Sequence, residues 1–306
     1  MRLTLNRAFG GLGHRSPTQV LKKARAGRMA PGPTEQPSPG ITPDIEQIAQ
    51  EAAIARGLLA ASDSDRQQMY GSAYDAIYTT SLKRRGPSID DQTFGASRRL
   101  LPLLEKISKP GQNVLEVGCG VGLLTIELGR LGRHTVGVDV SRVALDRART
   151  FAEGVAEFEL VSGTHLPYKD ESFDAAFSVE VLEHLHEHDA PPHLTEMLRV
   201  LRPGGRYWIV TPNALLSRGS AARFGVDVQA DGDVHLKEWT YSQLIVAARK
   251  AGFTNMRTPW RNYSLASFPL LPAGLKASIE RPFATSPVLT KLAGITSVSI
   301  LVQRPR

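Results

Sequence analysis

A run of glycines followed by one acidic residue is the part of the sequence best suited to binding a ligand. Gly118, Gly120 and Gly122 follow a short apolar stretch, and Asp139 ends a second apolar stretch 21 positions after Gly118. Glycine has no Cβ, so the backbone of such a turn can approach a ligand closely. A carboxylate at the end of the next strand can accept both hydroxyl groups of a ribose. These residues therefore predict a nucleoside site.

The spacing of the glycines separates two classes of nucleotide ligand. Dinucleotide sites require glycine at the last place of G-x-G-x-x-G, and this sequence has Leu123 there. The pattern is instead E-x-G-x-G-x-G beginning at Glu116. It resembles motif I of the class I S-adenosylmethionine-dependent methyltransferases, in which the turn faces the methionine part of the cofactor. A glycine turn in another kind of α/β protein is the alternative.

Two further segments extend this resemblance over about residues 95–255 and the final strand. Residues 166–174 are similar to the family's L-P-F-x-D-x-S-F-D, and residues 198–205 to its L-R-V-L-K-P-G-G. The resemblance implies an α/β fold, a Rossmann-like sheet of seven mostly parallel strands with helices on both faces and an antiparallel last strand. The cofactor-binding residues that it implies are Glu116, Gly118, Cys119, Gly120, Gly122, Asp139, Val140, Ser162, Gly163, Thr164 and Glu180.

Three of these residues carry a more specific expectation. Ser162 stands where many relatives have an aspartate that meets the adenine amino group, and a serine oxygen can still accept one hydrogen bond. Glu116 is expected to orient the turn or the amino group of the cofactor. Cys119 is the only cysteine, which excludes a disulfide within the chain, and we assign it no catalytic role.

A second group of residues able to do chemistry follows the predicted fourth strand. Glu180, Glu183 and His184 stand at i, i+3 and i+4, so one helical turn can direct all three side chains the same way. This E-x-x-E-H pattern resembles the ubiquinone-biosynthesis O-methyltransferases. It also resembles the small-RNA 3′-terminal 2′-O-methyltransferases, whose T-P-N and H-x-x-E-W segments recur here at 211–213 and 235–239.

In the RNA enzymes the pattern carries a divalent metal near the attacking hydroxyl. The resemblance thus implies a metal site, its identity open between Mg, Mn and Zn, made by Glu180, Glu183, His184 and His235. In the alternative interpretation no metal is bound, and the same residues line the substrate crevice. His184 is the candidate general base in both interpretations, with Glu183 and His235 as further catalytic candidates.

The pattern of apolar and polar residues divides the chain into three parts. These are a disordered basic tail at 1–40, a helical extension or cap at 41–110, and a methyltransferase domain at 111–306 with a lid-like insertion at about 262–292.

Two side-chain patterns accompany this division. Tyr70, Tyr74 and Tyr78 lie at i, i+4 and i+8, on one helical face that either packs on the core or closes over the active site. A run of histidines, interpreted as a solvated loop, comprises His186, His188 and His193.

Charge is divided unevenly along the 306 residues, which carry a formal net charge of +7. Residues 1–34 contain seven basic and no acidic side chains, residues 35–253 carry −6, and residues 254–306 carry +6. An enzyme acting on a duplex more often has a basic stripe on its core, so we do not expect a nucleic-acid partner. The oligomeric state is left open.

No apolar run approaches the roughly 20 residues of a membrane-spanning helix. We therefore expect a cytoplasmic protein that touches a membrane surface at most. The alternative is an organelle, because the Arg-rich and acid-free start also fits a targeting segment.

These observations favour S-adenosylmethionine-dependent O-methylation of a small molecule, a glycan or a lipid-linked precursor. A metal-assisted RNA 2′-O-methyltransferase is the second hypothesis, supported by the three matching segments. A non-catalytic S-adenosylmethionine-binding protein with a regulatory or assembly role is the third.

Overall fold

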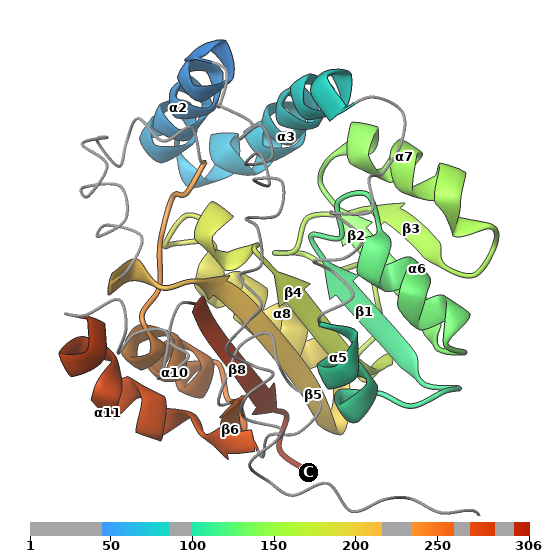
Figure 1. Ribbon diagram of the computed structural model, residues 1–306, viewed down its shortest axis with the longest axis vertical. Helices are drawn as coiled ribbons and strands as arrows, with labels where there is room; N and C mark the ends of the chain where they lie inside the picture. Colours follow the sequence, from blue (N-terminus) through green and yellow to red (C-terminus); the bar gives the residue numbers. More distant parts are fainter. Residues whose placement is uncertain (1–44, 86–99, 216–233, 260–269, 285–296) are drawn as a thin grey trace, which may run out of the picture. The chain divides into compact units, whose positions relative to one another are not determined.

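The computed structural model describes residues 45–85, 100–215, 234–259, 270–284 and 297–306 (Figure 1). The predicted tail at 1–40 lies outside these residues. The strands are β1 (Asn113–Val117), β2 (His134–Asp139), β3 (Glu157–Leu160), β4 (Phe173–Val179), β5 (Leu201–Pro212), β6 (Thr254–Pro259), β7 (Leu270–Pro272) and β8 (Ser297–Gln303). The helices are α2 (Ile45–Ala60), α3 (Asp63–Arg85), α5 (Leu101–Ile107), α6 (Leu123–Arg130), α7 (Arg142–Ala152), the 3₁₀ helix η1 (Leu182–His184), α8 (Ala190–Val200), α10 (Tyr241–Lys250) and α11 (Ala273–Ala284).

The strands form one sheet in the order β3-β2-β1-β4-β5-β8-β6-β7. The first five are parallel to one another, and β8 runs antiparallel to both β5 and β6. The α/β class and the mostly parallel sheet are as predicted. The predicted count of seven strands is wrong by one, because β7, a strand of three residues, pairs with the outer edge of β6.

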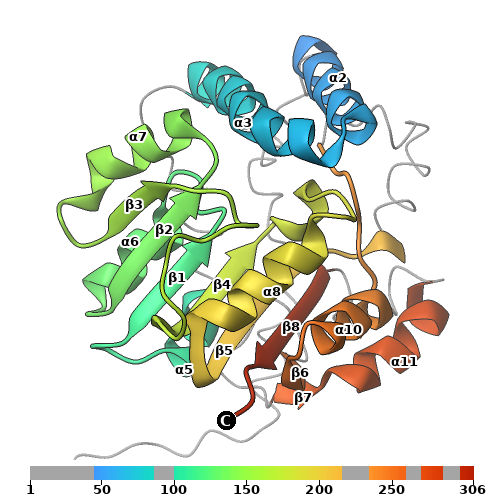
Figure 2. The same cartoon turned by 180° about the vertical axis from the view of Figure 1, so that it is seen from behind.

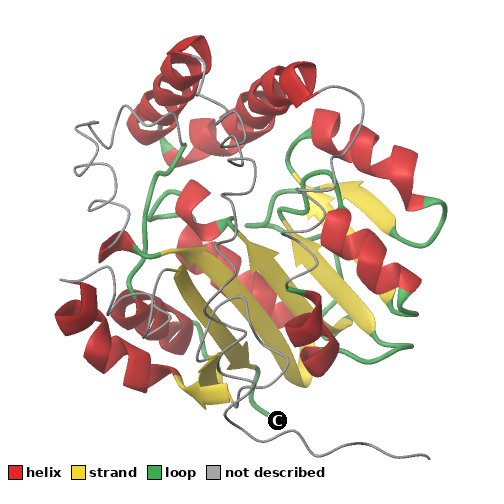
Figure 3. Cartoon of the chain, in the orientation of Figure 1, coloured by secondary structure: helices red, strands yellow, loops and turns green. Residues whose placement is uncertain are grey.

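Alternate residues of each central strand enter two different cores. Leu115 packs toward α8 and α10, whereas its neighbour Val114 packs toward α5 and α6. Figure 1 shows α5 and α6 in front of the sheet, Figure 2 shows α8 in front, and Figure 3 shows the strands between the two layers. Because side chains alternate across a strand, apolar runs such as Ala175-Ala176-Phe177 are buried on both faces. In the described part of the chain, no helix has both the length and the apolar character needed to cross a bilayer.

Helix α3 lies across the end of the sheet to which β1 and β4 point (Figure 1). It is joined to the core by a buried ion pair in which Arg66 Nε lies 2.8 Å from Asp189 Oδ2. Tyr70 donates to the same carboxylate at 2.8 Å. Further along the helix, Asp75 Oδ1 accepts hydrogen bonds from Ser141 Oγ and from the backbone N–H of Val143. The extension therefore docks on the loops at this end of the sheet.

Replacing Asp189 by alanine is expected to destabilise the protein by about 3 kcal/mol, because the buried guanidinium of Arg66 would lose its counter-ion. The free energy of unfolding in urea measures this loss. The matched control is Asp63→Asn, since Asp63 pairs with the same guanidinium but is 66% exposed. The control is expected to lose much less stability, because water screens an exposed ion pair. Equal losses for the two variants would contradict the assignment.

Residues 270–284, the described half of the predicted lid, do not line the pocket at the end of the sheet. It forms β7 and α11, and α11 packs against α10 and β6. Glu280 of α11 accepts hydrogen bonds from the backbone N–H groups of Tyr241 and Ser242 at the start of α10. A carboxylate there satisfies amides that have no partner within their own helix. The lid prediction is therefore wrong for these residues, and the rest of the insertion lies outside the described residues.

Candidate active site

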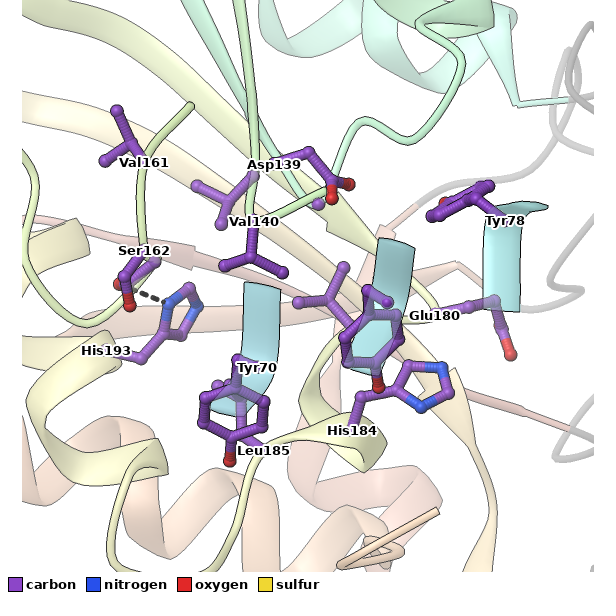
Figure 4. Close-up of a pocket in the computed structure, with 15 residues that line it drawn as sticks. Tyr70, Tyr78, Asp139, Val140, Val161, Ser162, Glu180, His184, Leu185 and His193 are labelled. Carbon is purple, nitrogen blue, oxygen red and sulfur yellow. Dashed lines mark hydrogen bonds between the residues drawn. The ribbon is translucent and has the colours of Figure 1, made fainter. Parts of the chain in front are cut away.

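A pocket open to solvent lies at the ends of β1, β2 and β4 under α3. In α/β sheets ligands bind at the carboxyl ends of the strands. Figure 4 shows the side chains converging on this space. The residues that line it are Tyr70, Tyr74, Tyr78, Val117, Gly118, Asp139, Val140, Val161, Ser162, Gly163, Glu180, Val181, His184, Leu185 and His193.

The glycine turn connects β1 to α6, with φ angles of +68° at Gly118, +53° at Gly120 and +78° at Gly122. A Cβ added to Gly120 would lie 2.5 Å from Tyr78 Oη, the movable end of that side chain, so the positive φ is the main reason for glycine here. The side chain of Cys119 packs with Ile126 and the α7 core. Of the predicted turn residues, Gly118 alone lines the pocket, and Cys119 can offer a ligand only its backbone.

Asp139 is held at the end of β2 by two backbone amides. Its Oδ2 accepts from Gly120 N and its Oδ1 from Ser141 N, both at 2.8 Å. Burial raises the pKa of Asp139, and these amides oppose that effect by stabilising the ionised carboxylate. Each carboxylate oxygen can accept a further hydrogen bond, and Asp139 lines the pocket. Both features suit a carboxylate that receives the hydroxyl groups of a ribose.

Glu116 lies at the end of β1 but not on the pocket. Its Oε2 accepts from the backbone N–H of Thr125 at 2.9 Å and also from the Thr125 hydroxyl. Thr125 is in the first turn of α6, where backbone amides lack partners within the helix. Of the two expected roles, the structure thus shows the orienting of the turn. Burial raises the pKa of Glu116 to about 8.

This raised pKa makes stability depend on pH. An unfolded glutamate has a pKa of 4.5, so between about pH 5 and pH 8 the folded protein binds more protons at Glu116 than the unfolded chain does. The free energy of unfolding is therefore expected to fall as pH rises, by up to about 1.4 kcal/mol per pH unit for this group. Urea titrations at several pH values should show that the free energy of unfolding depends less steeply on pH in Glu116→Gln than in the parent protein. Identical slopes for Glu116→Gln and the parent would reject the burial effect.

The loop after β3 is held from both sides. Ser162 and Thr164 donate their hydroxyls to Gln67 Oε1 of α3, at 3.2 and 2.9 Å. On the other side, His193 Nδ1 lies 2.9 Å from Gly163 O, and His193 Nε2 lies 2.7 Å from Tyr207 Oη. Ser162 and Gly163 line the pocket, whereas Thr164 supports the loop through Gln67.

His193 is the functional-site residue that sequence reasoning missed. It is wholly buried, and burial lowers its pKa to about 4. The expectation of a solvated loop is wrong for this histidine, although His188 is 61% exposed. The signal lay in helical spacing, because His193 shares the buried face of α8 with Ala190, Leu194, Met197 and Val200.

The acidic and histidine residues after β4 lie in η1 and in the short turn that leads into it. Glu180 directly follows β4 and has φ at +55°, an uncommon conformation for a residue other than glycine. Glu183 is fully buried, and its Oε2 accepts from Thr211 Oγ1 at 2.8 Å. A side-chain hydrogen bond also joins Glu183 to Glu180. Burial, reinforced by the charge of Glu183, raises the pKa of Glu180 to about 8.

The imidazole of His184 is fixed by a backbone carbonyl, with Nδ1 lying 2.9 Å from Val234 O. A carbonyl only accepts, so Nδ1 bears the proton and Nε2 is the basic nitrogen of the neutral ring. His184 Nε2 lies 4.0 Å from Glu183 Oε1, and the ring of His235 lies 5.2 Å from that of His184. One ligand atom from each of Glu183, His184 and His235 lies within 4.8 Å of the others. Glu180, the fourth predicted ligand, is not in this group, while Glu183 and His235 lie beside the pocket rather than on its lining.

The three segments singled out in the sequence meet at this turn. The carbonyl of Glu183 accepts from the backbone N–H groups of Leu236 and Lys237, at 2.7 and 3.0 Å. Trp239 Nε1 donates to Leu182 O at 3.3 Å, and Asn213 forms a β-bridge with Trp239. Residues 211–213 and 235–239 therefore build the wall behind η1.

The tyrosine face of α3 lines the pocket, as in the second of its two expected roles. The ring of Tyr74 meets that of His184 edge-on, with centroids 5.7 Å apart. The sheet order, the glycine turn after β1 and the acid at the end of β2 together define a Rossmann-like nucleoside-binding domain of the methyltransferase type.

Comparison with known proteins agrees with this class. Residues 115–209 match the family model of the methyltransferase domain. Methyltransferase GfsG of Streptomyces halstedii is 41% identical over 128 residues, which are 39% of this chain and 45% of that protein. A ubiquinone biosynthesis O-methyltransferase of Sinorhizobium medicae is 32% identical over 120 residues, 38% of this chain and 48% of the relative. This chain thus spans a little under half the length of these two relatives.

An N-methyltransferase is also among the relatives: phosphoethanolamine N-methyltransferase 1 of Arabidopsis thaliana is 32% identical over 160 residues, 50% of this chain and 31% of that protein. A methyltransferase solved in complex with the Haloferax volcanii Trm112 methyltransferase activator has the same fold, with a TM-score of 0.54 at 17% identity over 76% of this chain and 98% of that one. The chain carries a class I S-adenosylmethionine-dependent methyltransferase domain.

Proposed function

We propose that the protein transfers the methyl group of S-adenosylmethionine to a hydroxyl group of a small molecule. The observation that carries the proposal is one pocket lined by both Asp139 and His184. Asp139 is the donor-binding carboxylate, and His184 presents a basic Nε2 because its Nδ1 is bonded to Val234 O. The similarity to a ubiquinone biosynthesis O-methyltransferase supports the same chemistry.

In this reaction the residues of the chain bind the donor, exclude water and remove a proton from the acceptor. When bound, S-adenosylmethionine supplies a methyl group already activated by its sulfonium. The glycine turn and Asp139 hold the nucleoside, and the loop at Ser162–Gly163 borders the adenine. His184 Nε2 takes the proton of the acceptor hydroxyl, and α3 excludes water from above. Alignment and proton removal account for the catalysis expected here.

The direct test is a transfer assay with tritiated methyl donor and a cell extract separated into small-metabolite, lipid, protein and RNA fractions. The proposal expects label in the small-metabolite or lipid fraction. Label in RNA alone would favour the second candidate below. Donor binding without transfer to any fraction would indicate a regulatory or assembly protein.

Metal-assisted 2′-O-methylation of RNA is the second candidate. It is supported by the cluster of Glu183, His184 and His235, whose ligand atoms lie within 4.8 Å of one another. Carboxylate and imidazole donors fit a divalent cation. Such a cation would lower the pKa of a hydroxyl that it contacts.

Chelation separates the two candidates. If a metal acts, EDTA is expected to abolish transfer, added divalent metal to restore it, and His235→Ala to reproduce the loss. In the metal-free reaction, EDTA leaves the rate of the parent protein unchanged.

A further inference from the structure

The hydroxyl group of Tyr74 is buried and has no hydrogen-bond partner among the described residues. By contrast, the hydroxyl of Tyr70, on the same face of α3, donates to Asp189 at 2.8 Å. A buried hydroxyl without a partner opposes folding. An unpaired group of this kind on the lining of a pocket indicates that a ligand supplies its partner.

Tyr74 lines the pocket together with the predicted donor-binding carboxylate, Asp139, and the predicted base, His184. The rings of Tyr74 and His184 meet edge-on, with their centroids 5.7 Å apart. An ordinary tyrosine phenol has a pKa of about 10. The phenol therefore keeps its proton at neutral pH and acts as a hydrogen-bond donor.

We infer that Tyr74 donates a hydrogen bond to the acceptor atom itself and so selects oxygen over nitrogen. The inference rests on the proposed function and sharpens it. A hydroxyl oxygen has two lone pairs, so one can accept from Tyr74 while the other attacks the methyl carbon. A neutral amine has one lone pair, and its attack leaves the phenol proton unpaired in a buried place.

The charges around Tyr74 define the acceptor further. Among the described residues that line the pocket, none is lysine or arginine, and the acidic ones are Asp139 and Glu180. A phosphate or carboxylate next to the reacting atom would have no counter-charge there. Amines are disfavoured by the Tyr74 phenol, which needs a second lone pair on the acceptor atom. The acceptor is an uncharged alcohol or phenol.

The reaction balances without any further reactant. The acceptor oxygen forms a bond to the methyl carbon while the carbon–sulfur bond breaks, and sulfur keeps the electron pair as a neutral thioether. The hydroxyl proton passes to His184 Nε2. Tyr74 keeps its own proton throughout, since its task is to orient the lone pairs of the oxygen.

Tyr74→Phe tests the inference, with Tyr70→Phe as the matched control on the same helix face. Tyr74→Phe is expected to keep or raise the Tm, because it removes an unpaired buried hydroxyl. It should bind S-adenosylmethionine as the parent does and transfer methyl groups to the labelled extract fraction about tenfold more slowly or worse. Tyr70→Phe is expected to lower the Tm, because its hydroxyl has a partner in Asp189. Hydriodic acid should release the parent's tritium as methyl iodide, which marks an ether rather than a methylamine.

The outcomes distinguish this inference from the proposed function. Label that stays on nitrogen through the acid treatment would overturn oxygen selection while methyl transfer stands. An unchanged rate in Tyr74→Phe would overturn the role of this hydroxyl. So would a lower Tm accompanied by loss of donor binding, since that marks a structural residue. A parent protein that labels no fraction would remove the proposed function, and the inference with it.

Discussion

Asp139→Ala is expected to weaken S-adenosylmethionine binding by about a hundredfold or more. Hydrogen bonds to a charged group contribute about 1.5–3 kcal/mol each, and the ribose of the bound donor would lose two of them. The substitution also releases the amides of Gly120 and Ser141, which the carboxylate holds at 2.8 Å. Without these hydrogen bonds, the glycine turn is less well ordered for ligand binding before the donor arrives. Isothermal calorimetry measures the change in Kd directly.

Asp146→Ala is the control for this experiment. Asp146 lies on α7, a few residues beyond the pocket, and is 63% exposed in an ion pair with Arg149. Its removal should leave the Kd for S-adenosylmethionine unchanged. If Asp139→Ala bound the donor as tightly as the parent, the ribose contact assigned to this carboxylate would be wrong.

His184→Asn is expected to lower kcat by about 10²- to 10⁴-fold, the usual contribution of a positioned general base. An asparagine amide can still donate to Val234 O, which His184 Nδ1 reaches at 2.9 Å, so the loop should keep its conformation. Donor affinity should be retained, because the predicted ribose and turn contacts come from β1 and β2. Initial rates with the labelled extract fraction, together with calorimetry of the donor, separate the two parameters.

His188→Asn provides the comparison, since His188 is 61% exposed and its ring contacts His186 and Asp63 outside the pocket. Its kcat should match that of the parent. Loss of donor binding in His184→Asn would instead mean that this histidine shapes the cofactor site. Loss of activity both in His184→Asn and in the EDTA-treated parent protein would mean that His184 acts as a metal ligand rather than as the general base.

Much of the fold was predictable because its central strands, such as β4 and β5, contain apolar runs. Strands buried on both faces leave such runs in the sequence. Strand β7 was not predictable, since Leu270–Pro272 has only three residues. It is defined by its pairing with β6, and the local sequence does not indicate that pairing. The same contact explains why half of the apolar insertion packs at the sheet edge.

The candidate site was predictable where backbone geometry demands a residue type. Gly118 and Asp139 lie on the pocket because a tight turn needs glycine and the end of β2 faces the crevice. Side-chain direction was harder to predict. Glu116 turns to Thr125 and Cys119 turns into the α7 core, choices decided by packing across the sheet. His193 was predicted to lie in a solvated loop because it was grouped with the nearby His186 and His188. Its helical spacing with the apolar residues of α8 is what indicates burial.

The bonds of α3 to the loops around the pocket have a kinetic consequence. Gln67 holds the loop after β3, Arg66 and Tyr70 hold Asp189, and Asp75 holds the start of α7. If the spent nucleoside leaves beneath α3, these hydrogen bonds must break before it can dissociate. Steady-state turnover would then report the rate at which α3 moves away, while a single turnover with preloaded donor would report the chemistry.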